Sequence, residues 1–332
     1  MTTLLPGLPR LAGPLSGGAH GGLAPTRQVL IIHNPASGRP GPHRAVYRVA
    51  LGMRAAGWRV DVDATARRGH TTILAAQAAA VGIPLAAAAG GDGTVNEVLQ
   101  TLVGTRTALG VLPVGTVNLW AAEARIPGDT DRLVALLSSP SRRLVDVGLA
   151  GTRYFLLMAG LGFDAAVVQA VPAALKRRIG RWAYAVAGAE IAGRYAGTPV
   201  RLRLDGRELR CTLLMMVIGD TRRYAGGFRA TPRAVADDGH LDVCIIRGEH
   251  PFGSLPQLGA GLAGLSLLRH GVVRARVARI DVLPESGIPM QVDGDFAGFA
   301  PTHISVRPQS LRVAAPNDHR NGLFGTSSDY LL

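Results

Sequence analysis

An apolar run that breaks into glycines and then resumes with helical spacing is the feature that most constrains this chain. The stretch "LAAAAGGDGTVNEVLQTL" at 85–102 is typical of a buried strand, a tight loop and the start of a helix. Glycines at such a junction allow the backbone to approach a ligand closely and to adopt positive φ. The helix that follows presents free N–H groups and a positive dipole end. The stretch therefore predicts a phosphate-binding loop at the end of a strand.

Asp92 lies in the middle of this loop, where a carboxylate would repel a phosphate. A magnesium ion or a substrate hydroxyl between the two groups would remove that conflict, so we expect Asp92 to bind metal or to accept a proton. Two other nucleotide signatures are absent from the sequence. Without a GxxxxGKS or GxxxxGKT pattern a P-loop enzyme is disfavoured, and without GxGxxG followed by an acidic residue hydride transfer is disfavoured.

Strands and helices alternate through the first half of the chain. Apolar or alternating runs predict the strands, at 29–33, 58–65, 83–89 and the beginning of 108–121. Helical spacing predicts the helices between them, at 43–56, 71–81 and 95–102. This order predicts a parallel α/β sheet with loops at the strand ends.

After about residue 145 the pattern changes to short strands with turn residues between them. Two alternating runs within 200–219 are joined by Asp205-Gly206, which is the strongest short-range signal of a hairpin. Further strands are expected at 241–248, 277–284, 288–295 and 303–313, with helical segments near 172–194 and 254–269. The second half is therefore predicted to be mostly antiparallel β, a β-sandwich domain.

Length and composition limit the class of protein. A chain of 332 residues is long enough for two domains. Residues 1–26 are dense in glycine and proline and lack the basic start and apolar core of a signal peptide, so we expect a flexible arm. No window offers about 18 uninterrupted apolar residues. Cys211 and Cys244 form no CxxC pair and are expected to be buried, reduced thiols, which suits a cytoplasmic protein.

The formal net charge of +13 indicates an anionic partner, whether nucleotide, anionic membrane or nucleic acid. Aromatic residues are sparse and no recognition module is visible, so nucleic acid is disfavoured. Charge alone does not choose between a nucleotide and a membrane.

The motifs, taken in order, resemble one family. "GGDGTVNEV" at 90–98 resembles the nucleotide loop of the diacylglycerol kinase catalytic family, which includes sphingosine kinases and soluble bacterial lipid kinases. NAD kinases and phosphofructokinases also carry GGDG, so it is the ordered set that makes the resemblance specific. The set covers roughly 28–315. Its other members are "HNPASG" at 33–38, "LPVGTVNLWA" at 112–121, "AGLGFDAAV" at 159–167, the segment 222–243 and "VDGD" at 292–295.

The resemblance implies two domains with the active site in the cleft between them. Residues 27–145, joined by about 305–332, would form the α/β ATP-binding domain, and 146–304 the β-rich domain that binds lipid and metal. Arg39 or Arg67 could assist the phosphates. By resemblance, the residues around ATP would be Asn34, Pro35, Ala36, Ser37, Gly38, Thr65, Gly90, Gly91, Asp92, Gly93, Thr94, Val95, Asn96 and Thr116.

The resemblance also implies a magnesium ion and a catalytic base. Asp238 would supply a carboxylate to Mg²⁺, and Val235 and His240 would supply main-chain oxygens. The family's base is the glutamate of a DGE motif, and this chain has Asp295 in its place, a carboxylate on a stem shorter by one methylene. Asp293 and Asp92 are the other candidates for the base.

A basic amphipathic pattern at 174–186 favours a membrane surface as partner. Helical spacing places Leu175, Ile179, Trp182 and Val186 on one face and Lys176, Arg177 and Arg181 on the other. An ordinary surface helix packed on the core would show the same pattern. Attachment would be peripheral and reversible, at the inner face of the membrane.

Together these features predict a kinase that uses ATP and Mg²⁺ to phosphorylate the hydroxyl of a membrane lipid, such as diacylglycerol or a sphingoid base. The alternatives are a kinase of a soluble acceptor such as NAD and a non-catalytic nucleotide-binding protein. A homodimer is left open.

Overall fold

The computed structural model describes residues 27–35, 37, 42–67, 69–172, 175, 179–180, 182–224, 228–265, 271–316 and 322–325. The predicted arm at 1–26 lies outside these residues. So do six residues singled out from the sequence, namely Ala36, Gly38, Arg39, Lys176, Arg177 and Arg181.

The N-terminal half is built on four parallel strands in the order β2-β1-β3-β4. Their bounds are β1 (Gln28–His33), β2 (Arg59–Ala64), β3 (Leu85–Gly90) and β4 (Ala108–Pro113). Strands β1 and β3 are buried along their whole length, which explains why their sequences are continuous apolar runs and not alternating ones. The predicted parallel α/β sheet is confirmed.

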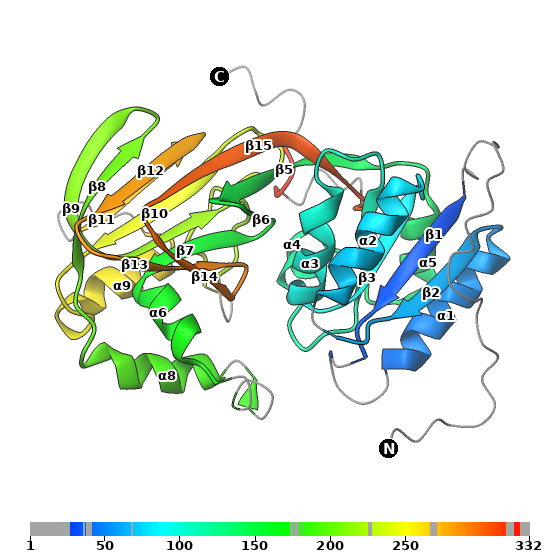
Figure 1. Cartoon of the computed structure of the whole chain (residues 1–332), viewed down its shortest axis with the longest axis horizontal. Coiled ribbons are helices and arrows are strands. Elements are labelled where there is room, and N and C mark those ends of the chain that lie inside the picture. The colour runs from blue at the N-terminus through cyan, green and yellow to red at the C-terminus, as the bar shows by residue number, and fades with distance from the viewer. Residues whose placement is uncertain are drawn as a thin grey trace.

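Helices cover both faces of this sheet (Figure 1). They are α1 (Pro42–Ala55), α2 (His70–Ala80), α3 (Asp92–Leu102) and α5 (Thr130–Ser138). The chain runs in one direction across the sheet from β1 to β2, and in the opposite direction from β2 past β1 to β3 and β4. Because each crossover is right-handed, α1 lies on one face and α2 and α3 lie on the other. Helix α3 begins at Asp92, three residues before the predicted start, so the last loop glycine belongs to its first turn.

The C-terminal half is an antiparallel sandwich-like assembly. Its strands are β5 (Arg143–Ala150), β6 (Arg153–Phe155), β7 (Met158–Gly162), β8 (Thr198–Leu204), β9 (Arg207–Gly219), β10 (Leu241–Arg247), β11 (Val272–Val277), β12 (Arg279–Pro284), β13 (Ile288–Val292), β14 (Asp295–Ala300) and β15 (Thr302–Val313). The short helices among them are α6 (Phe163–Ala170), α8 (Trp182–Ala192), η2 (Phe252–Ser254) and α9 (Leu255–Leu262).

The β8–β9 hairpin forms where the sequence predicts it. Asp205 and Gly206 have φ of 46° and 82°, which is the conformation of a type I′ turn. Leu202 is buried while its neighbour Arg201 is exposed, so the alternation faces the core on one side only. Of the two unpaired cysteines, Cys244 is buried as expected, whereas Cys211 is only half-buried.

Strand β15 connects the two halves. It pairs with β12 and β5 in the second half, and its end reaches β4, where the Ala314 N–H donates to the Leu109 carbonyl oxygen at 2.9 Å. One path of paired strands therefore runs through both halves, β14-β13-β7-β9-β8-β12-β15-β4-β3-β1-β2, while β5, β6, β10 and β11 branch from it. Figure 1 shows the halves side by side with β15 and β5 running between them. This connection holds the two halves together, and α3 of the first half contacts the β13–β14 turn of the second.

Candidate active site

The glycine loop joins β3 to α3 through extended backbone. Gly91 has φ −95° and ψ −173°, and none of Gly90, Gly91 and Gly93 has positive φ, so the expectation of positive φ is wrong here. Space explains two of the glycines. A Cβ on Gly90 would collide with the Thr94 side chain. A Cβ on Gly91 would lie 3.2 Å from the Val117 carbonyl oxygen. Gly93 faces open space, which leaves the start of α3 accessible on that side.

Neighbouring loops meet the glycine loop because their strands are adjacent in the parallel sheet. Asn34, which follows β1, donates from Nδ2 to the Thr94 hydroxyl at 3.4 Å. The Ser37 hydroxyl donates to the Asn34 carbonyl oxygen at 2.8 Å and tightens that turn. Thr65, which follows β2, donates its N–H to the His33 carbonyl oxygen at 2.8 Å. Residues predicted from three separate motifs thus lie at one edge of the sheet.

The loop after β4 completes this edge. The Gly115 N–H donates to the Gly90 carbonyl oxygen at 3.1 Å, and Thr116 beside it is exposed. Pro35 is exposed as well, whereas Val95 and Asn96 are buried within α3. Neutral N–H and hydroxyl groups are therefore prominent among the described residues of this edge.

The Asp92 carboxylate holds the start of helix α4 (Leu119–Glu123). The Leu119 N–H donates to Oδ2 at 2.9 Å, and the Trp120 N–H donates to Oδ1 at 3.1 Å. Burial raises the pKa of Asp92 to about 6, although these two bonds oppose the rise; the charge of Asp293 adds to it. Both carboxylate oxygens are therefore engaged with backbone N–H groups, an arrangement that the sequence did not indicate.

Asp293 lies at the β13–β14 turn, with φ 48°, and binds both halves of the molecule. Its Oδ1 accepts from the N–H groups of Leu157 and Met158 at 3.0 and 2.9 Å. Its Oδ2 accepts from the Leu156 N–H at 3.1 Å and from Asn96 Nδ2, on α3, at 2.7 Å. Burial raises the pKa of Asp293, and the hydrogen bonds oppose that rise. This carboxylate therefore links the two halves through hydrogen bonds.

Asp295 differs from its neighbour in being open to solvent. Its side chain is 39% exposed, and the contact found for its carboxylate in the described residues is Arg153 Nη2 at 3.9 Å. Arg153 also donates to Asn96 Oδ1 at 3.4 Å, and Gln100 donates to the same oxygen at 3.0 Å. Asn96, Arg153, Asp293 and Asp295 thus form one polar cluster drawn from both halves.

Sequence reasoning missed Arg153 and Gln100. Gln100 lies four residues after Asn96 on the same face of α3, and a polar pair at that spacing was the available signal. Nothing in the sequence marks Arg153, which reaches the cluster only because β6 folds back beside α3.

The GLGFDA segment forms a second buried network. Asp164 accepts hydrogen bonds from the Tyr224 hydroxyl and, at 2.8 Å, from Gln291 Nε2. Burial raises the pKa of both Asp164 and Tyr224. A Cβ on Gly160 would collide with the Asp164 carboxylate, which explains that glycine. The network joins α6 to β13, and Gln291 also accepts the Gly294 N–H at 2.8 Å, so the network supports the β13–β14 turn.

The predicted metal segment lies beside β5 and β11 in the second half. Asp238 Oδ1 accepts from the His240 N–H at 2.9 Å, and its Oδ2 pairs with Arg276. Asp146 accepts from the Gln309 N–H at 2.7 Å and faces the same segment. Val235 is half-buried beside them. The ring of His240 is partly exposed and also contacts Asp238, with Nδ1 2.8 Å from the Asp238 carbonyl oxygen and 3.8 Å from its carboxylate.

The chemistry of this region fits a hard cation. Asp220 is wholly buried, and neither carboxylate oxygen has a hydrogen-bond partner among the described residues. Burial, and then the charges of neighbouring aspartates including Asp146 and Asp238, raise its pKa. Mg²⁺ prefers such oxygen ligands. In the described part of the chain no three acidic, histidine or cysteine side chains are grouped as a metal site, so a cation here would need main-chain oxygens as well.

The geometry defines a protein with a parallel α/β half and an antiparallel β-sandwich-like half, whose glycine-loop helix contacts the second half, and comparisons with known proteins identify the family. The model of the diacylglycerol kinase catalytic domain matches residues 28–150, and that of the YegS C-terminal NAD kinase beta sandwich-like domain matches 158–315. This chain belongs to the family of diacylglycerol kinases and YegS-like lipid kinases. The resemblance seen in the ordered motifs is confirmed in both halves.

Individual relatives agree with this assignment. A protein of Chromohalobacter salexigens named "Probable lipid kinase YegS-like" is 33% identical over 292 residues, covering 86% of this chain and 92% of the relative. A diacylglycerol kinase of Staphylococcus carnosus is 28% identical and covers 89% and 97%. The crystal structure of a diacylglycerol kinase from Bacillus anthracis shares the fold, with a TM-score of 0.68 at 20% identity over 88% of this chain and 97% of that chain.

Proposed function

We propose that this protein is a kinase that transfers the γ-phosphate of ATP to the hydroxyl of a membrane lipid. Beyond family membership, the main support is the contact between Asn96 of the glycine-loop helix and Asp293 of the β13–β14 turn. Through this contact, the helix that follows the glycine loop in one half lies directly against the β13–β14 turn of the other half. Phosphoryl transfer needs this arrangement, because it depends on aligning donor and acceptor and on placing a base beside the acceptor.

ATP would lie at the edge formed by the loops after β1, β3 and β4. The first N–H groups of α3, before Thr94, and the hydroxyls of Thr65 and Thr116 offer hydrogen bonds to phosphate oxygens, whereas Thr94 is buried and its N–H donates to the Gly91 carbonyl oxygen. These groups carry little positive charge. Mg²⁺ bound with the nucleotide would neutralise the phosphates. Arg67 is exposed nearby and remains a candidate for additional charge.

Asp295 is our candidate for the base that accepts the proton of the lipid hydroxyl. Among the three aspartates of the two motifs, Asp92 and Asp293 already accept backbone N–H groups with both oxygens. Asp295 has an exposed carboxylate near Arg153, which would hold it in place without enclosing it. We therefore assign Asp92 and Asp293 to positioning the loops and Asp295 to proton transfer.

A second Mg²⁺ would be held by the Asp238 carboxylate with the main-chain oxygens of Val235 and His240. Asp146 lies across the same segment, and its bond to the Gly239 N–H at 2.5 Å sets the conformation of that turn. The ion would supply positive charge to a region where carboxylates outnumber their partners. Its role in this proposal is to stabilise the segment between β9 and β10.

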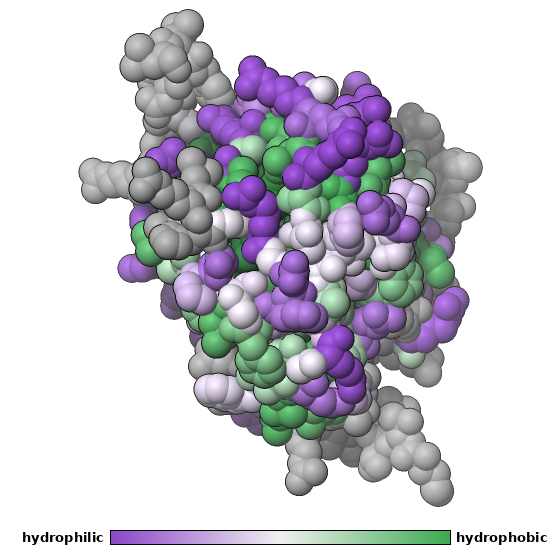
Figure 2. All heavy atoms as spheres, turned by 90° about the vertical axis from the view of Figure 1, so that its left-hand side faces the viewer, coloured by the Kyte–Doolittle hydropathy of each residue, from purple (hydrophilic) through white to green (hydrophobic). Residues whose placement is uncertain are grey.

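Contact with a membrane would involve the end of the molecule formed by α8, η2 and α9. No helix of the described residues is long and apolar enough to cross a bilayer. Figure 2 shows apolar side chains, mixed with hydrophilic ones, over the lower part of this end, where Figure 1 places α8. The exposed apolar side chains here are Trp182, Val186, Phe252, Leu255 and Leu265, at 54% to 64% exposure. Such a patch suits a peripheral contact with lipid.

The test is transfer of labelled γ-phosphate from ATP and Mg²⁺ to a panel of lipid alcohols in mixed micelles, with NAD as a soluble acceptor in parallel. We expect a labelled lipid product and no labelled NAD. Label in NAD alone would replace the lipid acceptor by a soluble one. ATP binding without transfer to any acceptor would indicate a nucleotide-binding protein without catalysis.

A further inference from the structure

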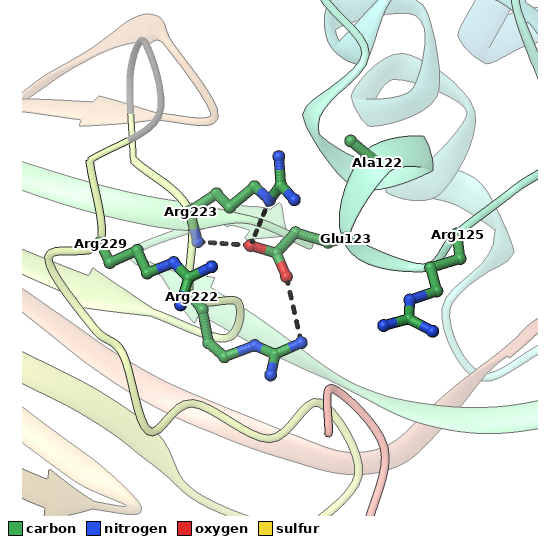
Figure 3. Close-up of a pocket in the computed structure, with 6 residues that line it drawn as sticks. All are labelled: Ala122, Glu123, Arg125, Arg222, Arg223 and Arg229. Carbon is green, nitrogen blue, oxygen red and sulfur yellow. Dashed lines mark hydrogen bonds and ion pairs between the residues drawn. The ribbon is translucent and has the colours of Figure 1, made fainter. Parts of the chain in front are cut away.

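A charged pocket lies between the two halves, away from the glycine loop. It has a volume of about 200 Å³ and is lined by Ala122, Glu123, Arg125, Arg222, Arg223 and Arg229 (Figure 3). The first three come from the end of α4, and the other three come from the segment after β9. Four of the six lining residues are arginines and one is a glutamate, so basic side chains predominate in the lining of this partly enclosed space. Such a space attracts an anion.

Glu123 holds two of these arginines in place. Its side chain is 2% exposed and lies 3.6 Å from Arg222 Nη2 and 3.7 Å from Arg223 Nε. It also accepts the Arg223 N–H at 2.5 Å. Figure 3 shows the guanidinium groups of Arg222, Arg223 and Arg229 gathered around this carboxylate. The pocket wall is therefore held in place from both halves before any ligand arrives.

Arg125 occupies a backbone position that favours glycine. It follows the last turn of α4 with φ 51°, and the Ile126 N–H donates to the Ala121 carbonyl oxygen at 2.8 Å. This bond is the one that closes a helix C-terminus when the intervening residue is left-handed, and that residue is usually glycine. An arginine here adds strain to the backbone but places a guanidinium beside the pocket. Its presence points to a use for the side chain.

Helix α4 separates the pocket from the proposed nucleotide site. Asp92 holds the first residues of α4, whereas Glu123 is its last residue. Five helical residues span about 7 Å, so the pocket lies at the opposite end of α4 from the glycine loop. Its small volume suits a compact anion and excludes a whole nucleotide.

We propose that this pocket binds a phosphate group, presented by an anionic phospholipid headgroup or by a small phosphorylated molecule. The planar fork of a guanidinium matches two phosphate oxygens at once, and several arginines around one anion are typical of such sites. Because both halves line the pocket, a bound phosphate would strengthen the contact between them.

Titration of the full chain with inorganic phosphate at constant ionic strength, followed by calorimetry, tests the proposal. Arg229→Ala should weaken binding about 10-fold or more, because charge-assisted hydrogen bonds are lost. Arg201→Ala is the matched control. It removes one charge from an equally exposed position on β8, outside the pocket, and should leave binding unchanged. If the two variants weaken phosphate binding equally, or if neither weakens it, the proposal of a phosphate site is contradicted.

Arg125→Gly separates binding from folding. We expect it to weaken phosphate binding while the thermal midpoint stays the same or rises, because glycine relieves the positive φ. Unchanged phosphate binding in this variant would contradict the proposal. Neither measurement uses turnover, so a failure here leaves the proposed kinase activity untouched.

Vesicles identify the source of the phosphate. Binding of the wild type and Arg229→Ala is compared on phosphatidylcholine vesicles and on phosphatidylcholine mixed equally with phosphatidylglycerol. Weaker binding of the variant to the mixed vesicles alone assigns the pocket to a lipid headgroup. A loss confined to inorganic phosphate assigns it to a small phosphorylated molecule. Wild-type behaviour of the variant with both ligands would exclude a phosphate site.

Discussion

The glycine loop before α3 and the β13–β14 turn lie on either side of the contact between Asn96 and Asp293, yet they use their aspartates differently. In the loop, Asp92 gives both oxygens to the start of α4. In the turn, Asp293 is saturated by four hydrogen bonds, whereas Asp295, two residues away, keeps an exposed carboxylate beside Arg153. A motif therefore does not assign the same role to each of its carboxylates. Those whose oxygens are occupied by N–H groups position the loops, and an open one remains for chemistry.

The two saturated carboxylates also differ from each other. Asp92 binds only within the N-terminal half, since its partners belong to α4. Asp293 joins the halves through Asn96. Loss of Asp92 should therefore disturb one loop, whereas loss of Asp293 should weaken the contact between domains.

Asp293→Ala should give the largest effect. It removes four hydrogen bonds and leaves the N–H groups of residues 156–158 without their acceptor, so we expect a loss of about 3 kcal/mol in the free energy of unfolding. Denaturant unfolding of the full chain measures it. Asp295→Ala is the control, and it should change stability by about 0.5 kcal/mol or less. Equal losses of stability in the two variants would contradict the different roles given to Asp293 and Asp295.

Asp92→Ala should lower the free energy of unfolding by about 2 kcal/mol, because the two N–H groups at the start of α4 lose their acceptor. The effect should depend on pH. The folded-state pKa of Asp92 is raised from 3.8 to about 6, so the wild type loses stability as the pH rises through that window. Alanine does not titrate. The difference in the free energy of unfolding between wild type and variant should therefore become smaller as the pH rises from about 4 to above 6. A difference that widens over this range would show that Asp92 is charged and stabilised at low pH.

Asp220→Asn should give the smallest effect, and it should be stabilising. Burial raises the pKa of Asp220, so the wild type loses stability as the pH rises above the ordinary value of 3.8. Asparagine keeps the shape without the charge. In a buffer with a chelator, we expect the free energy of unfolding of the variant to equal that of the wild type near pH 4. At pH 8 we expect it to be higher by about 1 kcal/mol. Thermal unfolding across this pH range measures the gain, and a variant that is less stable at pH 8 would contradict it.

Much of the fold could be predicted because local patterns agree with burial. The run before Gly90 is continuous because β3 is covered on both faces. Asp205-Gly206 marks the hairpin because few other pairs adopt positive φ at two successive positions. In both cases the sequence within a few residues determines the structure.

The uses of the site residues could not be predicted in the same way, because they depend on distant contacts. The acceptor role of Asp92 involves Trp120, 28 residues further along the chain. Arg125 and Arg229 line one pocket only because α4 packs against the segment after β9. The loop glycines were predicted as residues of a ligand site, but Gly90 makes room for Thr94 of the same chain. The assignment of Asp295 as base remains a prediction.

The most direct measurement is the rate of γ-phosphate transfer to lipid by Asp295→Asn and Asp295→Glu, each corrected for the folded fraction. We predict a loss of about 10²-fold or more for Asp295→Asn, with stability unchanged and activity largely kept in Asp295→Glu, because the exposed carboxylate accepts the proton. Wild-type transfer by Asp295→Asn would contradict this assignment and would return the role of base to Asp92 or Asp293.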